Sequence, residues 1–285
     1  MNTKKLIVKD TDFSYISNNK IIRFNRPLVM GILNVTSDSF YDGGKYNTEK
    51  AQIEHSKIMI EQGADIIDIG AMSTRPGAIN FTEEEEIKRI EPVIKTLIKH
   101  FPDAVFSVDT FRSKVAKMSA ENGIHIINDI SGGTIDKNMF KTISKLNIPY
   151  VMMHIQGTPQ NMQKNPVYNN VVEDIYNYFS KKIAELNNLG FNKIILDPGF
   201  GFGKTVQHNY KLLKELKYFK KLNLPILVGI SRKSMINKVL GTTPAEALNG
   251  TTVLNTIALM NGANILRVHD VKEAKEAVKI IKLLN

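Results

Sequence analysis

The chain has 285 residues, 42% of them hydrophobic and 23% charged, which is typical of one ordinary globular domain or two small ones. It contains no cysteine, and this excludes disulfide bonds, thiolate nucleophiles and cysteine metal sites. No apolar run is long enough to span a membrane, and Lys9 and Asp10 interrupt the apolar stretch near the N-terminus. We therefore expect no membrane partner, no signal peptide and a cytoplasmic location.

The net charge of +10 is compatible with nucleic acid, an anionic surface or small anionic substrates. The lysines are scattered through helical segments, where they alternate with acids, and the chain has no nucleic-acid-binding motif. We therefore expect a solvated basic surface, no nucleic acid partner and small-molecule substrates.

Residues 1–26 contain two apolar stretches, 6–8 and 21–24. Between them lies a turn-like sequence, Asn18-Asn19-Lys20. Two short apolar stretches separated by a turn predict a β-hairpin, here placed ahead of the main fold.

From Pro27 onward, eight apolar runs of strand length alternate with eight segments of helical periodicity. The runs are 28–33, 65–69, 104–108, 124–127, 150–153, 193–196, 226–230 and 264–268. This alternation predicts a parallel sheet, and eight strand–helix units match a (β/α)8 TIM barrel over residues 27–285. A doubly wound open sheet is the alternative. The sequence shows no linker, so we expect a single domain over residues 1–285.

Several helix starts are visible in the sequence. Thr82 followed by Glu85 predicts a capping box. Two further starts are predicted from an N-cap residue followed by proline, at Asn165-Pro166 and at Thr243-Pro244.

Nearly every predicted strand ends in polar or ionisable side chains. These residues are Asn34, Asp68, Asp109, Asn128, Asp129, His154, Asp197, Ser231, Lys233, Arg267 and His269. The carboxyl ends of barrel strands carry the chemistry in such folds, so this pattern predicts a functional site there.

Four of these residues suit a flat heterocycle that carries several donors and a carbonyl. Asp109, Asn128, Asp197 and Lys233 supply acceptors, an amide and a cation. The loop after Asp197 is rich in glycine, which allows its backbone to approach a ligand closely.

A second group favours anions. The planar guanidinium groups of Arg75 and Arg267 suit phosphate oxygens, and His269 follows the eighth strand beside them. Asn34 ends the adjoining first strand, where it could help to hold a metal that neutralises a diphosphate.

The motifs together resemble those of dihydropteroate synthases, in the expected order over residues 27–271. They read Gly31-Ile-Leu-Asn-Val-Thr, Ser73-Thr-Arg-Pro-Gly, Asn128-Asp-Ile-Ser-Gly-Gly, Met153-His, Leu196-Asp-Pro-Gly-Phe-Gly-Phe-Gly-Lys, Ser231-Arg-Lys-Ser and Arg267-Val-His-Asp. The resemblance implies a transferase of folate biosynthesis that joins 4-aminobenzoate to (7,8-dihydropterin-6-yl)methyl diphosphate and releases diphosphate. It also implies Mg²⁺ as cofactor, a homodimer and inhibition by sulfonamides.

The resemblance assigns the residues to three subsites. The pterin would be held by Asp109, Asn128, Met153, Asp197 and Lys233. The aminobenzoate side would be shaped by Thr74, Arg75, Phe202 and Ser231. The diphosphate would be held by Asn34, Arg75, Arg267 and His269, with Asn34 acting through the metal. The residues implied to act in catalysis are Asn34, Arg75, Lys233, Arg267 and His269. We expect a dissociative, SN1-like displacement.

The sequence departs from the family pattern in two polar loops, 35–47 and 71–81, which we expect to form a lid over the site. Ser37 stands where proline is usual, and Ala71-Met72 replaces the common Gly-Glu. These differences affect the expected lid energetics and sulfonamide affinity rather than the pterin residues.

Three alternatives remain open at this stage. A pterin-binding methyltransferase domain would need no diphosphate site. A phosphosugar aldolase or isomerase barrel could use Lys233 as a Schiff-base lysine. A basic nucleic-acid-binding protein would show strongly salt-dependent retention on DNA.

Overall fold

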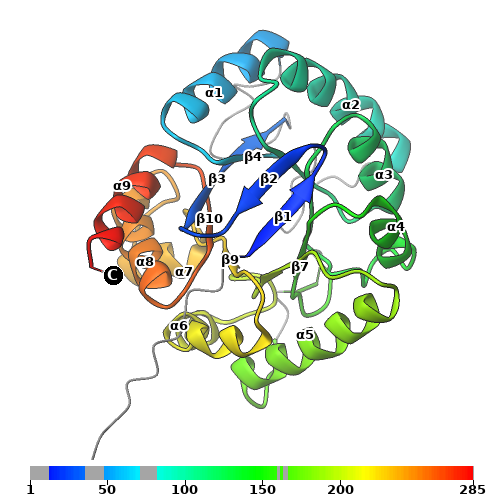
Figure 1. Ribbon diagram of the computed structural model, residues 1–285. Coiled ribbons are helices and arrows are strands. Elements are labelled where there is room, and N and C mark those ends of the chain that lie inside the picture. Colours follow the sequence, from blue (N-terminus) through cyan, green and yellow to red (C-terminus); the bar gives the residue numbers. More distant parts are fainter. Residues whose placement is uncertain (1–12, 36–47, 71–81, 159–160, 163–165, 285) are drawn as a thin grey trace, which may run out of the picture.

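The computed structural model describes residues 13–35, 48–70, 82–158, 161–162 and 166–284. In this part of the chain the strands are β1 (Ser14–Ser17), β2 (Lys20–Arg23), β3 (Leu28–Asn34), β4 (Ile66–Gly70), β5 (Phe106–Asp109), β6 (Ile126–Asp129), β7 (Tyr150–Met153), β8 (Ile194–Asp197), β9 (Leu227–Val228) and β10 (Ile265–Val268). The helices form a ring around the strands, and the β1–β2 hairpin lies across one end of that ring (Figure 1).

The main sheet of the described residues has eight parallel strands in the order β8-β7-β6-β5-β4-β3-β10-β9. Its two outer strands meet through a parallel bridge between Leu196 and Ile226, and Leu196 N donates to Pro225 O at 2.8 Å. The sheet is therefore a nearly closed barrel, and the predicted (β/α)8 architecture is confirmed.

The helices are α1 (Glu49–Glu61), α2 (Glu83–His100), α3 (Ser113–Glu121), α4 (Met139–Leu146), α5 (Val171–Asn188), α6 (Val206–Lys214), the 3₁₀ helix η1 (Leu216–Leu222), α7 (Ser234–Leu240), α8 (Leu248–Met260) and α9 (Val271–Lys282). The unit after β9 contains two of them, α7 and α8, where the sequence predicts one. No helix in the described ranges is both long and apolar enough to cross a membrane.

One of the three predicted helix N-termini is confirmed, and two are wrong. Thr82 and Glu85 form the predicted capping box of α2. The prediction of a start at Asn165-Pro166 is wrong for Pro166, which is not helical, while Asn165 lies outside the described residues. Helix α5 begins at Val171, because the side chain of its N-cap Asn170 accepts from Val172 N.

The predicted start at Thr243-Pro244 is also wrong, because α8 begins at Leu248. Thr243 N instead donates to the Glu246 carboxylate at 2.9 Å, which closes a separate turn. The carbonyls of Pro244 and Ala245 in that turn accept hydrogen bonds from the Arg232 guanidinium at 2.7 and 2.8 Å. They are therefore not the first acceptors of a helix.

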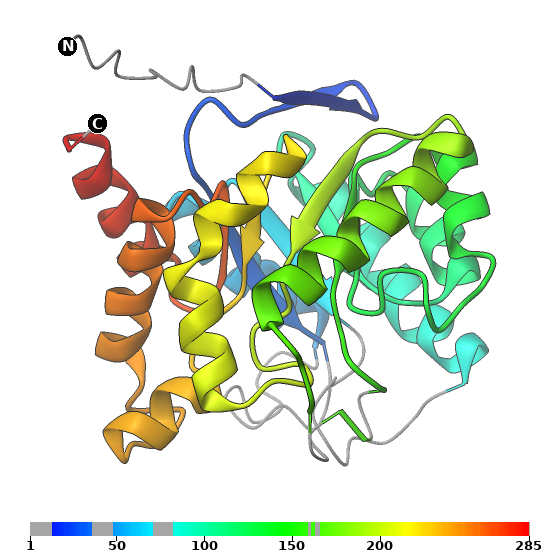
Figure 2. The ribbon, with the colours of Figure 1, turned by 90° about the horizontal axis from the view of Figure 1, so that it is seen from below.

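The core has two layers because alternate residues of a strand point to opposite faces of the sheet. In β3, for example, Val29 packs under the surrounding helices, whereas Met30 packs inside the barrel. The inner cluster also includes Tyr15, Ile22 and Phe24 from the hairpin segment, which therefore closes the end of the barrel where the strands begin. Figure 2 shows the hairpin on the outside of that end.

The hairpin is confirmed, but its first strand is not the predicted stretch 6–8, which lies outside the described residues. Strand β1 (Ser14–Ser17) pairs with β2 instead. The turn lies at Asn18 and Asn19 as predicted, and both have positive φ, at 44° and 63°, as a two-residue hairpin turn requires. Only alternate residues of β1 are buried, and one of these is Ser17, so this strand lacks an apolar run.

We expect Tyr15→Phe to lower the free energy of unfolding by about 1 kcal/mol. Tyr15 is buried, and its hydroxyl donates to the Ile194 carbonyl at 2.8 Å, a bond that phenylalanine cannot make. Urea unfolding checks the value. The matched control is Ile16→Ala on the exposed face of the same strand, expected to change stability by less than about 0.5 kcal/mol. Equal effects of the two changes would contradict the anchoring role of Tyr15.

Candidate active site

Strand alternation decides which predicted residues face the barrel interior. Asn34 lies four residues beyond the inward-facing Met30, so it has the same orientation. Residues that lie two or four positions beyond the inner-layer residues of the other strands have the same orientation, and they are Asp68, Asp109, Asn128, Met153, Asp197 and Arg267. These residues come from separate strands and converge inside the carboxyl end of the barrel, as the sequence predicts.

Arg267 on β10 forms hydrogen bonds to acids on two other strands, β4 and β5. Its Nε donates to Asp68 Oδ2 at 2.7 Å, and a terminal nitrogen donates to Asp109 Oδ2 at 2.9 Å. The Asn128 amide donates to the same Asp68 oxygen at 2.9 Å. Asp68 is completely buried, and within the described residues its Oδ1 has no hydrogen-bond partner.

Asp68 is a site residue with no role predicted from the sequence beyond that of a strand-end acid. Counting strand parity from Ile66 is the signal that places it in the interior. Its contacts with Arg267 and Asn128 show that it orients two of the predicted residues.

The acids of the site are held in a poorly solvated environment. Burial raises the pKa of the Asp109 carboxyl, and the nearby Arg267 opposes this increase. Burial also raises the pKa of Asp197, against the influence of Lys233 and of the Gly199 amide. Such carboxyls are stabilised by a ligand that brings hydrogen-bond donors to them.

Lys233 lies beside Asp197 and the glycine-rich loop. Its Nζ donates to the Phe200 carbonyl at 2.5 Å and lies 4.5 Å from the centroid of the Phe202 ring. Gly199 N donates to Asp197 Oδ1 at 2.8 Å. Burial lowers the pKa of Lys233 to about 8, with Asp197 favouring the charged form.

An apolar patch adjoins these charges. Met153 is buried in a small cluster with Ile130, Ile155 and Met162, and the partly buried Phe202 packs against it. The site therefore combines an apolar wall with polar groups, an arrangement that suits a flat ring with polar edges.

Two loops that follow β9 and β10 are joined by hydrogen bonds. The Ser231 hydroxyl lies 3.0 Å from His269 Nδ1 and accepts from His269 N at 3.2 Å. Arg232 makes two hydrogen bonds to Asp270, at 2.9 and 2.7 Å. The sequence analysis gives Arg232 and Asp270 no role, although they hold Ser231 and His269 together.

Not every strand-end residue joins the site. Asp129 has the outward parity of β6, and it accepts from Tyr150 Oη at 2.6 Å and from the amides of Ser131 and Gly133. It therefore fixes the β6 loop. Thr74, Arg75 and the whole predicted lid segment 71–81 lie outside the described residues, and so does the predicted lid segment 35–47 except for Val35.

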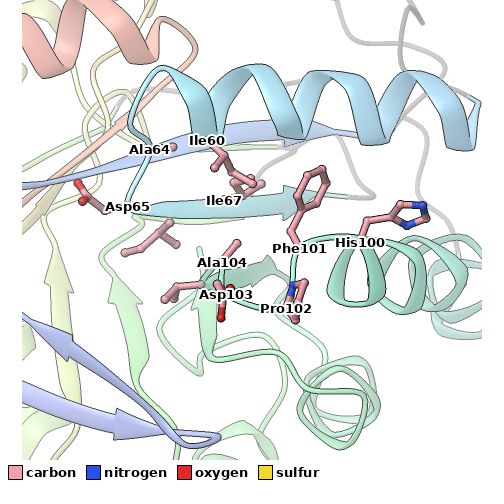
Figure 3. A pocket seen from close by; sticks show the side chains of 11 residues that line it. Ile60, Ala64, Asp65, Ile67, His100, Phe101, Pro102, Asp103 and Ala104 are labelled. Atoms are coloured by element: carbon pink, nitrogen blue, oxygen red, sulfur yellow. The ribbon is translucent and has the colours of Figure 1, made fainter.

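A cavity of about 380 Å³ lies elsewhere, near the strand starts of β4 and β5. Figure 3 shows Ile60, Ile67, Phe101 and Pro102 around it, with Asp65 and Asp103 nearby. None of the predicted site residues within the described ranges lines it, so we assign the active site to the carboxyl end of the barrel.

Comparison with known proteins identifies the family of the chain. The pterin binding enzyme family matches residues 30–269. Escherichia coli (strain K12) dihydropteroate synthase is 45% identical over 260 residues, covering 90% of this chain and 92% of that protein. A crystal structure of Yersinia pestis dihydropteroate synthase with a sulfonamide drug has a TM-score of 0.92 and 42% identity, covering 95% of this chain and 99% of that one. A Xanthomonas albilineans dihydropteroate synthase with 4-aminobenzoic acid has a TM-score of 0.88 and 35% identity, covering 96% of this chain and 98% of that one. The chain belongs to the pterin binding enzyme family and, within it, to the dihydropteroate synthases, which are transferases.

Proposed function

We propose that this chain condenses 4-aminobenzoate with (7,8-dihydropterin-6-yl)methyl diphosphate, giving 7,8-dihydropteroate and diphosphate for folate biosynthesis. The observation that carries the proposal is the convergence of Asp109, Asn128, Asp197, Lys233 and Arg267 inside the carboxyl end of the barrel. The family membership and the sulfonamide complex of a relative support it.

The pterin occupies the interior in this proposal. Asp197 and Asp109 accept from its amino and ring N–H groups, and the Asn128 amide and Lys233 contact its remaining polar edge. Met153 packs on the ring face. A buried carboxylate that meets paired donors regains the hydrogen bonds that burial removed, which favours this ring over solvent.

4-Aminobenzoate lies toward the mouth of the barrel in this proposal. Phe202 and Ser231 shape the aminobenzoate side, together with Thr74 and Arg75 from outside the described residues. Sulfonamides would compete for the same place. Arg267 and His269 hold the diphosphate, and the two hydrogen bonds that Arg267 makes to acids leave further N–H donors on its guanidinium.

The reaction needs no general base of high strength. The aniline nitrogen is neutral at pH 7 and nucleophilic, and the electron-rich dihydropterin stabilises a cation at its exocyclic carbon. The carbon–oxygen bond breaks with its electron pair on diphosphate, the carbon–nitrogen bond forms, and the nitrogen loses a proton to solvent. The main tasks of the protein are to position both reactants and to stabilise the separating charges, in an SN1-like displacement.

The test is a coupling assay with the pterin diphosphate and 4-aminobenzoate, following both diphosphate release and dihydropteroate. We expect equal amounts of the two products and inhibition by a sulfonamide that more 4-aminobenzoate relieves. Diphosphate release without dihydropteroate would show hydrolysis only and would contradict the proposal.

We also propose Mg²⁺ as the cofactor, bound with the diphosphate. Among the described residues no group of three or more His, Cys, Asp or Glu side chains could hold a metal. Asn34 Oδ1 lies 3.6 Å from the position that a Cβ of Gly70 would occupy, so the glycine leaves space beside this oxygen. A single amide oxygen suits Mg²⁺, which retains waters and takes further ligands from phosphate. When bound, the ion would neutralise charge on the leaving diphosphate.

EDTA should therefore stop turnover without unfolding the protein, because Asn34 alone binds the ion weakly. Activity and the circular dichroism melting curve would be recorded on the same EDTA-treated sample, before and after Mg²⁺ is added back. Full turnover in metal-free buffer would contradict the assignment, as would a melting curve that changes with the metal in the absence of diphosphate.

We further propose that the chain forms a homodimer through the outer face of α8. Val253, Ile257 and Met260 recur there at helical spacing and are 49%, 36% and 59% exposed. Leu254 and Ala258 are buried on the adjoining face, so the helix is apolar both where it meets the core and where it is exposed. A helix with this pattern is usually covered by another surface.

Ile257→Glu is expected to shift the protein from dimer to monomer in sedimentation velocity, because it places a charge at the centre of this face. Ile16→Glu, at a 62% exposed hairpin position, serves as the control and should leave the mass unchanged. A wild-type monomer at micromolar concentration would contradict the dimer.

The cytoplasmic location stays a prediction that cell fractionation can check.

A further inference from the structure

One buried cation in the described structure is not among the proposed substrate contacts. Lys204 is only 3% exposed, although it directly follows the glycine-rich loop. Its Nζ donates to the carbonyls of Gly199 at 2.8 Å and Phe202 at 3.0 Å, and it lies 3.1 Å from His154 Nδ1. The His154 carbonyl is a fourth, longer contact at 3.4 Å.

Placing an ammonium group here is costly, so its contacts must compensate for lost hydration. An ammonium has three N–H donors, and its three nearest acceptors match that number. Burial lowers the pKa of Lys204 to about 7, with Asp197 opposing and Lys233 reinforcing the effect. Burial keeps the pKa of His154 well below its usual value, so its ring is neutral and can accept.

The loop that Lys204 contacts has little conformational preference of its own. Gly199, Gly201 and Gly203 all have positive φ, which glycine adopts without strain but also leaves easily. A Cβ on Gly199 would lie 2.0 Å from the His154 carbonyl, so the loop is pressed against the segment after β7. Contacts from outside the loop must therefore select this conformation.

The same loop carries three features of the proposed site. Its Gly199 amide donates to Asp197, its Phe200 carbonyl accepts from Lys233, and its Phe202 ring packs near the Lys233 ammonium. A shift of the loop would move all three together.

We propose that Lys204 is a positioning residue that holds the 199–203 loop through its carbonyls and so fixes Asp197, Phe202 and Lys233 for the two substrates, without contacting either. This inference rests on the proposed function. It predicts that Lys204 affects the binding of pterin and aminobenzoate through the loop. Because His154 contacts Lys204, the segment after β7 also helps to hold the loop in place.

The test is Lys204→Met, which keeps an unbranched side chain of similar length and removes every donor. The variant leaves the Gly199 and Phe202 carbonyls and His154 Nδ1 without this donor, so we expect the melting temperature to fall modestly while the protein still folds. Calorimetry should show pterin affinity reduced about tenfold, within the range of coupling between contacting residues. The KM for 4-aminobenzoate should also rise. Lys214→Met, an exposed lysine on α6, is the matched control and should leave both unchanged.

A double-mutant cycle separates positioning from a general loss of stability. In an Asp197→Asn background, Lys204→Met should weaken pterin binding by no more than about threefold, because the residue through which it acts is already altered. An unchanged tenfold effect in that background, or wild-type affinities in the single variant, would overturn the inference. A wild-type protein without coupling activity would instead contradict the proposed function.

A second variant covers the case in which Lys204→Met does not fold. Lys204→Gln retains two N–H donors on a neutral group and is expected to fold, with pterin affinity between those of wild type and Lys204→Met. If neither variant folds, Lys204 is needed for the fold itself, and the positioning role is overturned.

Discussion

Replacing Arg267 with methionine is expected to lower the free energy of unfolding by about 3–5 kcal/mol at about pH 8.5. Arg267 is the cation that contacts both Asp68 and Asp109, and its side chain is only 20% exposed. Its removal leaves two buried carboxyls without this partner, which costs more than the loss of a surface ion pair.

The deficit should depend on pH in a definite direction. Burial already raises the pKa of Asp109 in the folded protein, and removing Arg267 raises it further. Below its wild-type folded pKa of about 7, Asp109 is protonated in both folded proteins, so its contribution to the deficit is small there. The deficit grows as the pH rises above that value, because only wild type keeps the cation that stabilises the ionised carboxyl, and it becomes constant above the higher folded pKa of the variant.

Urea unfolding of Arg267→Met and wild type at about pH 5 and about pH 8.5, on either side of the wild-type Asp109 pKa, measures both effects. The triple variant with Asp68→Asn and Asp109→Asn is the control for charge balance, and it should recover most of the lost stability. A deficit below about 1 kcal/mol that does not change with pH would show that the carboxyls do not depend on this cation.

Asp197→Asn is expected to weaken pterin binding by about 2–4 kcal/mol, or roughly 30- to 1,000-fold in affinity. The substitution keeps an oxygen that can accept from Gly199 N, so the loop turn should persist. It replaces the other acceptor with a donor that faces the donors of the pterin, and it removes a charge that Lys233 favours.

Calorimetric titration of a pterin into wild type and variant gives the difference in affinity directly. Asp103→Asn makes the same chemical change at an exposed position near the opposite end of the barrel, and its pterin affinity should equal that of wild type. If Asp197→Asn binds as tightly as Asp103→Asn, Asp197 does not recognise the ring.

The order of strands and the location of the site could be predicted because both depend on short-range patterns. Short, mainly apolar runs indicate the strands of the barrel, and the polar residues that end them lie at its carboxyl end. The capping box of Thr82 and Glu85 was predictable for the same reason, since its two hydrogen bonds join residues three positions apart.

Local patterns were misleading where tertiary contacts compete with them. Thr243 and Pro244 look like a helix start, but the adjoining carbonyls of Pro244 and Ala245 serve Arg232. Strand β1 has no apolar run, and it is held by bonds such as the one from Tyr15 to Ile194, 179 positions away.

The pairing of side chains inside the site was beyond the sequence alone. The alternation of side chains along a strand places Asp68 and Arg267 in the interior, but it does not show that they pair. They are 199 positions apart and meet only when the barrel closes. Lys204 lies just before helix α6 in the sequence, whereas folding buries it against His154, 50 positions away. Residue type and spacing set which strands and helices form, while closure of the barrel sets which charges lose their water and which partners replace it.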